Sequence, residues 1–161
     1  MKLSAKTRYA ARILFYMAKH NPSEPVSSNL LAAKTGISSQ FIEQILRQLR
    51  LAGITGSVRG AKGGHTLLRK PEELTFGCIV RLMEGGIELT SCLESPEACA
   101  RFGDCAVRNA WESLQGTLDG ALESITLDDI LRNEALCPAL TRPDPSPDAP
   151  GRDLHVAPPS P

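Results

Sequence analysis

The 161-residue sequence has few aromatic residues, no long apolar run and no net charge. Only 4% of its residues are Phe, Trp or Tyr, so a core must be built mainly from aliphatic side chains. No stretch approaches the roughly 18 consecutive apolar residues of a transmembrane helix. The apolar residues 13–18 are too few for a secretory signal and no convincing cleavage site follows them. We therefore expect a cytoplasmic protein without membrane spans.

Sequence motifs of the common enzyme classes are also missing. There is no Walker loop, no HExxH zinc-peptidase motif, no nucleophile elbow and no dinucleotide-binding fingerprint. We therefore do not expect an enzyme. The chain has five cysteines, but the closely spaced cysteine pairs that are typical of structural zinc sites are absent.

The charges are unevenly distributed, although their sum is zero. Residues 1–70 contain 12 Lys and Arg and only two acids, Glu24 and Glu43, whereas residues 71–161 contain 6 Lys and Arg and 16 acids. A strongly basic half is typical of a surface that meets the phosphates of nucleic acid. Two ordinary solvated surfaces are the alternative interpretation.

The basic half follows the order of a helix-turn-helix. Apolar spacing predicts helices over 5–19 and 29–34, then a third helix that begins at Ser38 or Ser39 and ends near Gly53. A glycine-containing turn separates the second helix from the third. The third helix has an apolar stripe on one side, formed by Phe41, Ile42, Ile45, Leu46 and Leu49.

A β-hairpin follows the third helix. Residues 54–58 and 65–68 are predicted strands, and residues 59–64 between them form a basic, glycine-rich tip. His65 follows these glycines, and we expect it to pack in the strand rather than to bind a ligand. The pattern predicts a mainly α fold, a winged helix-turn-helix.

The acidic half contains a cysteine loop, defined here as residues 85–105, between two predicted helices. The first helix spans 76–84, and the second runs from Ala106 to about Ser124. The second helix carries a long apolar stripe, formed by Val107, Trp111, Leu114, Leu118, Ala121 and Leu122. A stripe outside a small core needs a partner, and a second copy of the same helix would make a homodimer.

The C-terminal segments complete the predicted organisation. Residues 126–131 look like a short capped helix that packs back on the body, and residues 138–161 hold eight of the twelve prolines and are predicted to be disordered. We expect a DNA-binding domain over 1–75, a sensor and dimerisation region over 76–135, and a tail over 136–161.

Several short motifs along the first 64 residues form a recognisable set. They are Leu3, Arg8-Tyr9-Ala10, Gly36-Ile37-Ser38, Glu43-Gln44, Leu49-Arg50, Ser57-Val58-Arg59-Gly60 and Gly63-Gly64. Together they resemble the Rrf family of bacterial transcription regulators, which includes IscR, NsrR, RirA and CymR. The resemblance covers roughly residues 1–135, and its most specific parts are the wing and the three-cysteine loop. It implies a winged helix-turn-helix with a long dimerisation helix, a double-stranded DNA operator and, most simply, repression.

Candidate DNA contacts lie on the third helix and the wing. Gln40 and Gln44 can pair with adenine, and Glu43 can accept from a cytosine amine or, alternatively, act only as a helix carboxylate. Arg59 can enter the minor groove. The whole predicted set is Ser38, Ser39, Gln40, Glu43, Gln44, Arg47, Arg50, Arg59 and Lys62.

The cysteine loop carries the strongest chemical signal. Cys92, Cys99 and Cys105 are separated by six and five residues, and thiolates are soft ligands that suit iron or zinc. The wide spacing suits a cluster several ångströms across better than one ion, so we expect a [4Fe–4S] or [2Fe–2S] iron–sulphur cluster. Zinc, a thiol redox switch and structural cysteines remain alternatives. Cys78 is expected to be buried and structural.

The resemblance leaves the fourth ligand of such a cluster open. IscR-like members place a histidine where this chain has Arg108, and NsrR-like members place an aspartate where it has Arg8. An arginine cannot ligate a metal because its guanidinium stays protonated. An open iron would resemble RirA-type sensors, and the other candidates are a small exogenous ligand, Glu94, Glu97, Asp104 and Cys137.

The sequence predicts a DNA-binding regulator that senses iron–sulphur status, iron, oxidants or nitric oxide. A first rival is a metal-free, CymR-like regulator controlled by a protein partner or by thiol oxidation. A second rival is a cluster carrier or electron-transfer protein, which would leave the basic half and the wing without a role.

Overall fold

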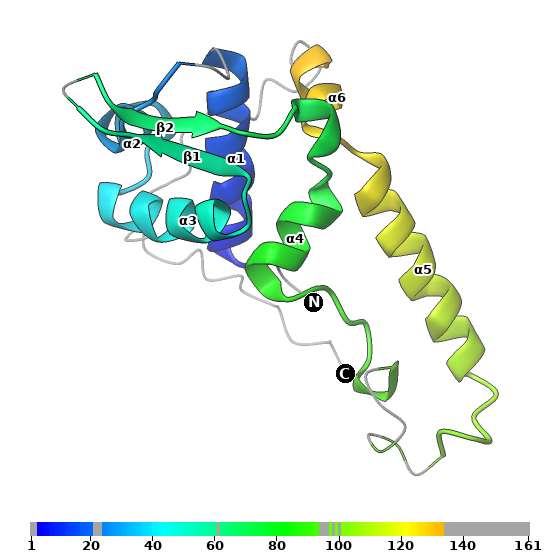
Figure 1. Ribbon diagram of the computed structural model, residues 1–161. Coiled ribbons are helices and arrows are strands. Elements are labelled where there is room, and N and C mark those ends of the chain that lie inside the picture. Colours follow the sequence, from blue (N-terminus) through cyan, green and yellow to red (C-terminus); the bar gives the residue numbers. More distant parts are fainter. Residues whose placement is uncertain are drawn as a thin grey trace, which may run out of the picture.

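The computed structural model describes residues 3–20, 24–60, 62–93, 97, 99 and 101–133, without the side chain of Cys92. Within these residues the fold is mainly helical, with six α-helices and one two-stranded sheet. Figure 1 shows a rounded body from which one long helix, α5, leans outward. The predicted tail over 136–161, with Cys137, lies outside the described residues.

The body contains the predicted helix-turn-helix and wing (Figure 1). Helix α1 spans Ala5–His20, α2 spans Ser28–Thr35 and α3 spans Ser39–Leu51. Strands β1, Thr55–Val58, and β2, Gly64–Leu67, pair antiparallel. The predicted winged helix-turn-helix is therefore confirmed, with element boundaries shifted by one or two residues.

Local capping fixes where α2 and α3 begin and end. The Ser27 hydroxyl accepts from the Leu30 amide at 3.2 Å, and the Ser38 hydroxyl accepts from the Phe41 amide at 3.4 Å. Gly36 ends α2 with a φ of 72°, a left-handed conformation that glycine adopts without a steric cost. These caps set the short turn between α2 and α3 that is typical of a helix-turn-helix.

The wing is tied to the segment that precedes α2. Val26 and His65 exchange two backbone hydrogen bonds, both 2.8 Å long. A Cβ added at the neighbouring Gly64 would lie 2.6 Å from the Val26 backbone, so this close approach requires glycine. The hairpin therefore starts from a fixed position beside the helix-turn-helix.

The core lies around α1 and is almost entirely aliphatic, as the low aromatic content predicts. Helix α3 contributes one side of its surface, α4 contributes Ile79 and Met83, and α6 contributes Leu127. Its largest fully buried side chains are Ile13, Leu14, Met17, Val26, Leu31, Ile42, Ile45, Leu46, Leu49, Leu74, Ile79 and Leu127. Burial of this kind stabilises a fold by about 25 cal/mol per Å² of apolar surface.

The described part of the acidic half leaves the body after α4 and returns to it at α6. After the 3-10 turn η1, Pro71–Glu73, helix α4 spans Phe76–Glu84 as predicted. The short helix α6, Leu127–Arg132, returns to the start of α4, where the Leu127 amide donates to the Leu74 carbonyl at 2.8 Å. Leu127 is buried, so the prediction that this helix packs back is confirmed.

Helix α5, Arg108–Ser124, differs from the other helices because none of its residues is buried. It begins two residues later than predicted, since residues 106 and 107 form a turn. Val107, Trp111 and Leu114 of the predicted stripe are 58%, 38% and 52% exposed.

Among the described residues, no helix is long and apolar enough to cross a membrane.

Candidate nucleic-acid interface and cysteine loop

One side of α3 is buried and the other is polar and exposed. The buried side holds the predicted apolar stripe, apart from Phe41, which is half-buried. The exposed side, called here the polar face of α3, also borders β2 at a shallow hollow that His65 helps to line. It comprises Gln40, Glu43, Gln44, Arg47 and Arg50, all predicted DNA contacts.

The two predicted serines lie at the N-terminal end of this helix. Ser38 and Ser39 are both exposed. Ser38 caps the helix, and the Ser39 hydroxyl is 3.4 Å from the Asn29 side-chain oxygen of α2. Backbone amides at the start of a helix favour anions, so this end of α3 is suited to a phosphate as well as to base edges.

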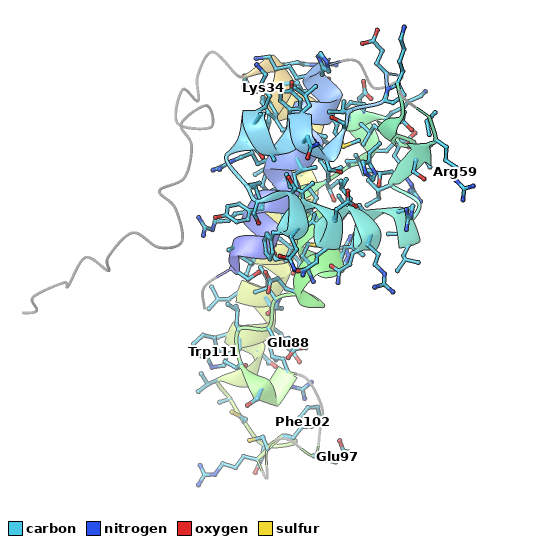
Figure 2. All side chains as sticks on the ribbon, turned by 90° about the vertical axis from the view of Figure 1, so that its left-hand side faces the viewer. Lys34, Arg59, Glu88, Glu97, Phe102 and Trp111 are labelled. Carbon is cyan, nitrogen blue, oxygen red and sulfur yellow. The ribbon has the colours of Figure 1, made fainter. Side chains whose placement is uncertain are left out.

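The basic wing residues extend from the hairpin tip. Arg59 and Lys62 are exposed, and Figure 2 shows Arg59 at the outer edge of the body. The tip is tight because the Gly63 amide donates to the Gly60 carbonyl at 2.9 Å. A Cβ at Gly63 would collide with the Val58 carbonyl oxygen. The glycines therefore hold two cations on a narrow projection beside the polar face of α3.

Glu43 is not a free carboxylate on that face. Its Oε1 accepts a short hydrogen bond from the Ser28 hydroxyl and lies 3.8 Å from Nε2 of His65. The same Nε2 is 3.3 Å from the Ser28 hydroxyl oxygen. Burial lowers the pKa of His65 below its usual 6.5, and the nearby Glu43 carboxylate partly offsets this shift.

The cysteine loop lies at the far end of α5 from the wing (Figure 2). Cys99 and Cys105 are free, half-buried thiols; the Cys99 carbonyl accepts from the Phe102 amide at 3.0 Å. The backbone of Cys92 lies in the turn η2, Ser91–Leu93, and its side chain is outside the described part. The two described thiols are soft donors that suit an iron–sulphur cluster.

The third thiol of the predicted set, that of Cys92, lies outside the described side chains. Among the side chains that the structure describes, no group of three or more His, Cys, Asp or Glu is arranged to hold a metal ion. Cys78, which was expected to be buried, is half-buried in α4 and packs against the core.

Arg108 holds the end of the loop against α5. Its guanidinium carbon lies 3.6 Å from the centroid of the Phe102 ring, a cation–π contact. One guanidinium nitrogen is 2.6 Å from a carboxylate oxygen of Glu112, one turn further along the helix. A cation thus occupies the position where IscR-like regulators are expected to place a histidine ligand.

Comparison with known proteins decides the family. A family model described as "Rrf2: Iron-dependent Transcriptional regulator" matches residues 3–133. The chain belongs to the Rrf2 family. It is therefore a DNA-binding transcriptional regulator related to IscR and CymR, and not an enzyme.

Individual relatives give the same result for this Rrf2 regulator. It is 35% identical to Protein rrf2 of Nitratidesulfovibrio vulgaris over 138 residues, which are 86% of this chain and 92% of the relative. It is also 35% identical to the regulator CymR of Bacillus subtilis, covering 81% and 89% of the two chains. The solved structure of T. potens IscR matches with a TM-score of 0.66 and 32% identity over 83% of this chain and 88% of that one.

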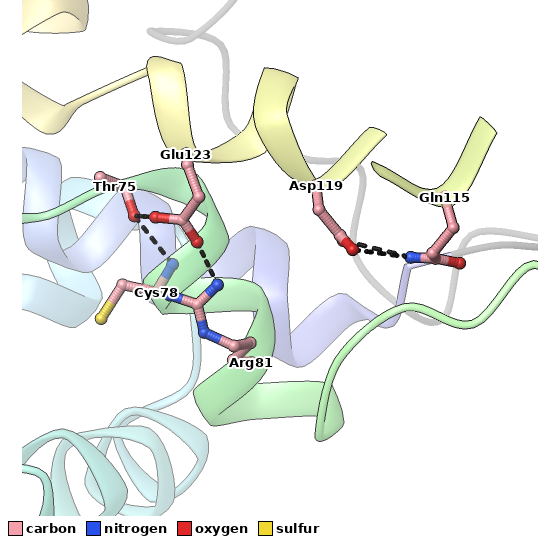
Figure 3. A network of polar contacts seen from close by, with 6 residues as sticks. All are labelled: Thr75, Cys78, Arg81, Gln115, Asp119 and Glu123. Atoms are coloured by element: carbon pink, nitrogen blue, oxygen red, sulfur yellow. Dashed lines mark hydrogen bonds and ion pairs between the residues drawn. The ribbon is translucent and has the colours of Figure 1, made fainter. Parts of the chain in front are cut away.

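A side chain of α5 holds the segment that leads into the cysteine loop of this Rrf2 regulator. The Gln115 amide nitrogen donates to the Ile87 carbonyl at 2.7 Å, and its amide oxygen accepts from the Leu89 amide at 3.0 Å. Asp119 accepts from the same nitrogen at 3.1 Å and keeps the side chain in place (Figure 3). The backbone just before Cys92 is thereby fixed to the long helix.

A second polar contact joins α5 to α4 near the body (Figure 3). Glu123 forms a short ion pair with Arg81 and accepts from the Thr75 hydroxyl at 2.8 Å. The pKa of Glu123 is lowered, first by the hydrogen bond from Arg81 and then by that from Thr75. A Cβ at Gly77 would collide with the Glu123 carboxylate, so a larger residue there would force the Glu123 side chain to shift.

Sequence reasoning missed the side chains that connect elements. Gln115 carried no motif or spacing signal, and His65 was expected only to pack. Ser28 and His65 are 37 residues apart in the chain. Their proximity arises from the Val26–His65 bridge, which local patterns do not encode.

Proposed function

We propose that this Rrf2 regulator is a homodimeric repressor that binds a specific DNA operator and is controlled by an iron–sulphur cluster on its cysteine loop. Residues 1–75 would form the DNA-binding unit and 76–135 the sensor and dimer unit. The observation that carries the DNA-binding part is the exposed polar face of α3 beside a basic wing.

Helix α3 would lie in the major groove. Gln40 and Gln44 are exposed and have the amide groups that pair bidentately with adenine. Arg47 and Arg50 extend from the same face and would neutralise phosphates, as would Lys62 on the wing and the serines at the helix start. These contacts combine base reading with sequence-independent attraction.

Dimerisation is supported by the exposed stripe on α5. Trp111 and Leu114 have large apolar surfaces that the chain by itself leaves in contact with water. Packing α5 against its copy would remove this surface from water. Two recognition helices at a fixed spacing would then read two half-sites of one operator.

The sensor part is supported by the chemistry of the loop. Cys99 and Cys105 lie close to the start of α5, and three thiolates with Cys92 form a donor set that holds iron–sulphur clusters. Such a cluster, when bound, supplies a redox-active and oxygen-sensitive centre. Its signal would be iron–sulphur status, iron, oxidants or nitric oxide.

A change in the conformation of the cysteine loop would be transmitted to the DNA-binding unit through α5. Gln115 holds residues 87–89, and Glu123 holds α4, whose buried Ile79 is part of the core. The state of the loop can shift the two recognition helices only by stabilising one arrangement of α5 over another.

A metal-free, CymR-like regulator is the second candidate. Two observations favour it, namely the 35% identity to CymR of Bacillus subtilis and the presence of Arg108 instead of a ligand near the loop. This candidate predicts a colourless protein whose DNA affinity responds to a protein partner or to thiol oxidation.

One experiment separates the candidates. The full chain is purified without oxygen, its visible absorbance, iron and acid-labile sulphide are measured, and it is used to select duplexes from a random DNA pool. Coloured protein that selects a palindromic site supports the whole proposal. Colourless protein that selects such a site supports the CymR-like candidate, and protein that enriches no sequence refutes both.

A further inference from the structure

Glu43 is the one acid on the polar face of α3, and its carboxylate is held from two other elements. Ser28, the first residue of α2, donates to Oε1 of Glu43, and His65 of β2 lies 3.8 Å from the same oxygen. Neither contact involves Oε2, and the Glu43 side chain is 58% exposed. One edge of the carboxylate is anchored while the side chain still borders solvent.

We propose that Ser28 and His65 are positioning residues that set the base preference of this Rrf2 regulator by fixing the orientation of the Glu43 carboxylate. The inference rests on the proposed function, in which Glu43 reads a base in the major groove. Ser28 and His65 need not touch DNA themselves.

Ser28 and His65 are themselves held in place, so they can fix the orientation of the Glu43 carboxylate. His65 is held by its two backbone hydrogen bonds to Val26, and its side chain is only 12% exposed. Ser28 lies two residues after Val26, at the capped start of α2. A glutamate has three rotatable side-chain bonds, so without anchors its carboxylate would sample many positions.

The hydrogen-bonding capacity of His65 fits the same role. Within the described residues, Nδ1 of His65 is buried without a hydrogen-bond partner, so the ring proton is best placed on Nε2, which points to Ser28 and Glu43. Two charged groups influence the ring: Glu43 raises the pKa of His65, and Arg50 lowers it. Because burial dominates and lowers this pKa, the ring is neutral at neutral pH.

A fixed carboxylate discriminates between bases more strongly than a mobile one. It accepts a hydrogen bond from the cytosine amine and repels the acceptor groups of guanine and thymine. A mobile carboxylate can rotate away from an unfavourable base into water, which removes most of the penalty. Loss of the anchors should therefore relax sequence preference and leave the attraction to phosphates unchanged.

The test compares variants on DNA that the protein itself selects. The wild-type full chain enriches duplexes from a random pool, and affinities are then measured for the selected duplex, for its single-base variants and for an unrelated duplex. Glu43→Ala should reduce discrimination at one base position on the order of tenfold. Ser28→Ala and His65→Gln should each relax the same position, and together they should approach Glu43→Ala.

Double variants distinguish positioning from a general structural effect. In the Glu43→Ala background, Ser28→Ala and His65→Gln should have no further effect on discrimination, because there is no carboxylate left to position. Affinity for the unrelated duplex should remain unchanged in Ser28→Ala and His65→Gln, whereas Glu43→Ala should raise it, because one negative charge that repels phosphates is removed. Glu24→Ala, which removes the other acid of the basic half, is the matched control and should keep wild-type discrimination.

An NMR titration supplies a readout that does not depend on DNA. The His65 ring, assigned by its absence in His65→Gln, should titrate below 6.5, and Glu43→Gln should lower its pKa further. An unchanged pKa in Glu43→Gln would show that the two side chains do not interact in solution and would overturn the inference.

The possible failures are distinguishable. If Glu43→Ala keeps full discrimination, the base-reading part of the proposed function is wrong, and the positioning role fails with it. If Glu43→Ala relaxes discrimination while Ser28→Ala does not, only the positioning role is wrong. Should His65→Gln unfold, the small and partly exposed Ser28→Ala change decides alone. Equal weakening on all duplexes would indicate a structural role and refute the inference.

Discussion

Single residues determine what the cysteine loop can bind. Arg108 contacts the Phe102 ring, the Phe102 carbonyl and Glu112, so its guanidinium ties the end of the loop to α5. The same guanidinium excludes Arg108 itself as a ligand. The loop thus combines thiols that suit a cluster with a cation at the position where IscR-like regulators are expected to place a ligand.

The three loop cysteines should be needed for a cluster, and the other two should not. Cys92→Ala, Cys99→Ala and Cys105→Ala should each give colourless protein after anaerobic reconstitution, because each removes one thiolate. Cys78→Ala is the matched control and should stay coloured, since Cys78 packs against the core. The measurement is iron and acid-labile sulphide per chain, and full retention of both in the loop variants would contradict the proposed site.

Cys137 lies outside the described residues and is one of the candidate fourth ligands. Cys137→Ala should also stay coloured, unless this thiol is the missing fourth ligand. Iron and sulphide content of this variant therefore tests the fourth-ligand question directly, independently of the three loop positions.

Replacing Arg108 should change the lifetime of a bound cluster. Arg108→His offers an imidazole, which can ligate iron, at the position where relatives are expected to have one. We expect its visible absorbance to decay several-fold more slowly than that of wild type in the presence of air or a chelator. Arg108→Lys keeps the charge without offering a suitable ligand and serves as the control. Equal decay of both variants would show that position 108 does not face the iron.

The wing and α3 have different chemistry on their exposed sides. The wing carries cations, and the polar face of α3 carries side-chain amides, two arginines and one anchored carboxylate. Gly60 and Gly63 allow the tight hairpin tip, and the Val26–His65 bridge fixes its base. Under the proposed function these two elements would contact DNA together, and the cations and the amides would have different effects on binding.

Arg59→Ala should weaken operator binding by about 1–3 kcal/mol if this side chain enters a groove. Arg59 is exposed at the edge of the body and makes the wing basic at its tip (Figure 2). Affinity titrations at several salt concentrations measure both the loss and the change in salt dependence. Lys34→Ala, another exposed cation on a different side of the body, should change affinity much less. A loss no larger than that of Lys34→Ala would argue against groove insertion.

Gln115→Ala should loosen the segment that leads into the cysteine loop. It removes two hydrogen bonds to the backbone of residues 87–89, each worth about 1 kcal/mol. Hydrogen exchange at the Leu89 amide should become faster, and the difference in DNA affinity between cluster-loaded and cluster-free protein should shrink. Thr117→Ala is the control, because the Thr117 hydroxyl bonds only within α5, to the Ser113 carbonyl. An unchanged affinity difference would exclude Gln115 from the coupling.

The predicted DNA-binding surface and the predicted sensor loop lie at opposite ends of the molecule. Figure 2 shows Arg59 on the body and Phe102 near the tip of the protruding half, with Trp111 between them on α5. Under the proposed function, a signal at the loop would reach the body through the helices that flank it, α4 and α5. Contacts of Gln115 and Glu123 hold α5 in this chain, but none of its residues is buried, so a partner that packs on it can shift it.

The exposed stripe on α5 predicts a dimer that a double charge substitution should disrupt. Trp111→Asp with Leu118→Asp would place two carboxylates in the apolar contact, where burial without a partner is unfavourable. Light scattering should then report monomers, and operator binding should be lost. Asn109→Asp with Ser113→Asp, two exposed polar positions of the same helix, should remain dimeric. Monomeric wild-type protein at micromolar concentration would refute the dimer.

Local sequence patterns determined most of the fold. The apolar stripe of α3, the capping serines and Gly36 act within a few residues, and they fixed the helix-turn-helix without help from distant parts of the chain. The glycine-rich basic tip likewise determined the wing. The prediction of α4 was correct at both ends, because Thr75 caps its start and Gly85 its end.

The tertiary structure alone decided which polar side chains meet. Ser28 reaches His65 across 37 residues, and Gln115 reaches Leu89 across 26, through contacts that depend on how whole elements pack. Periodicity and caps report short-range backbone preferences and contain no information about such pairs. The sequence thus determined the polar face, the wing and the thiols, whereas packing decided that Glu43 is anchored and that the cysteine loop is tied to α5.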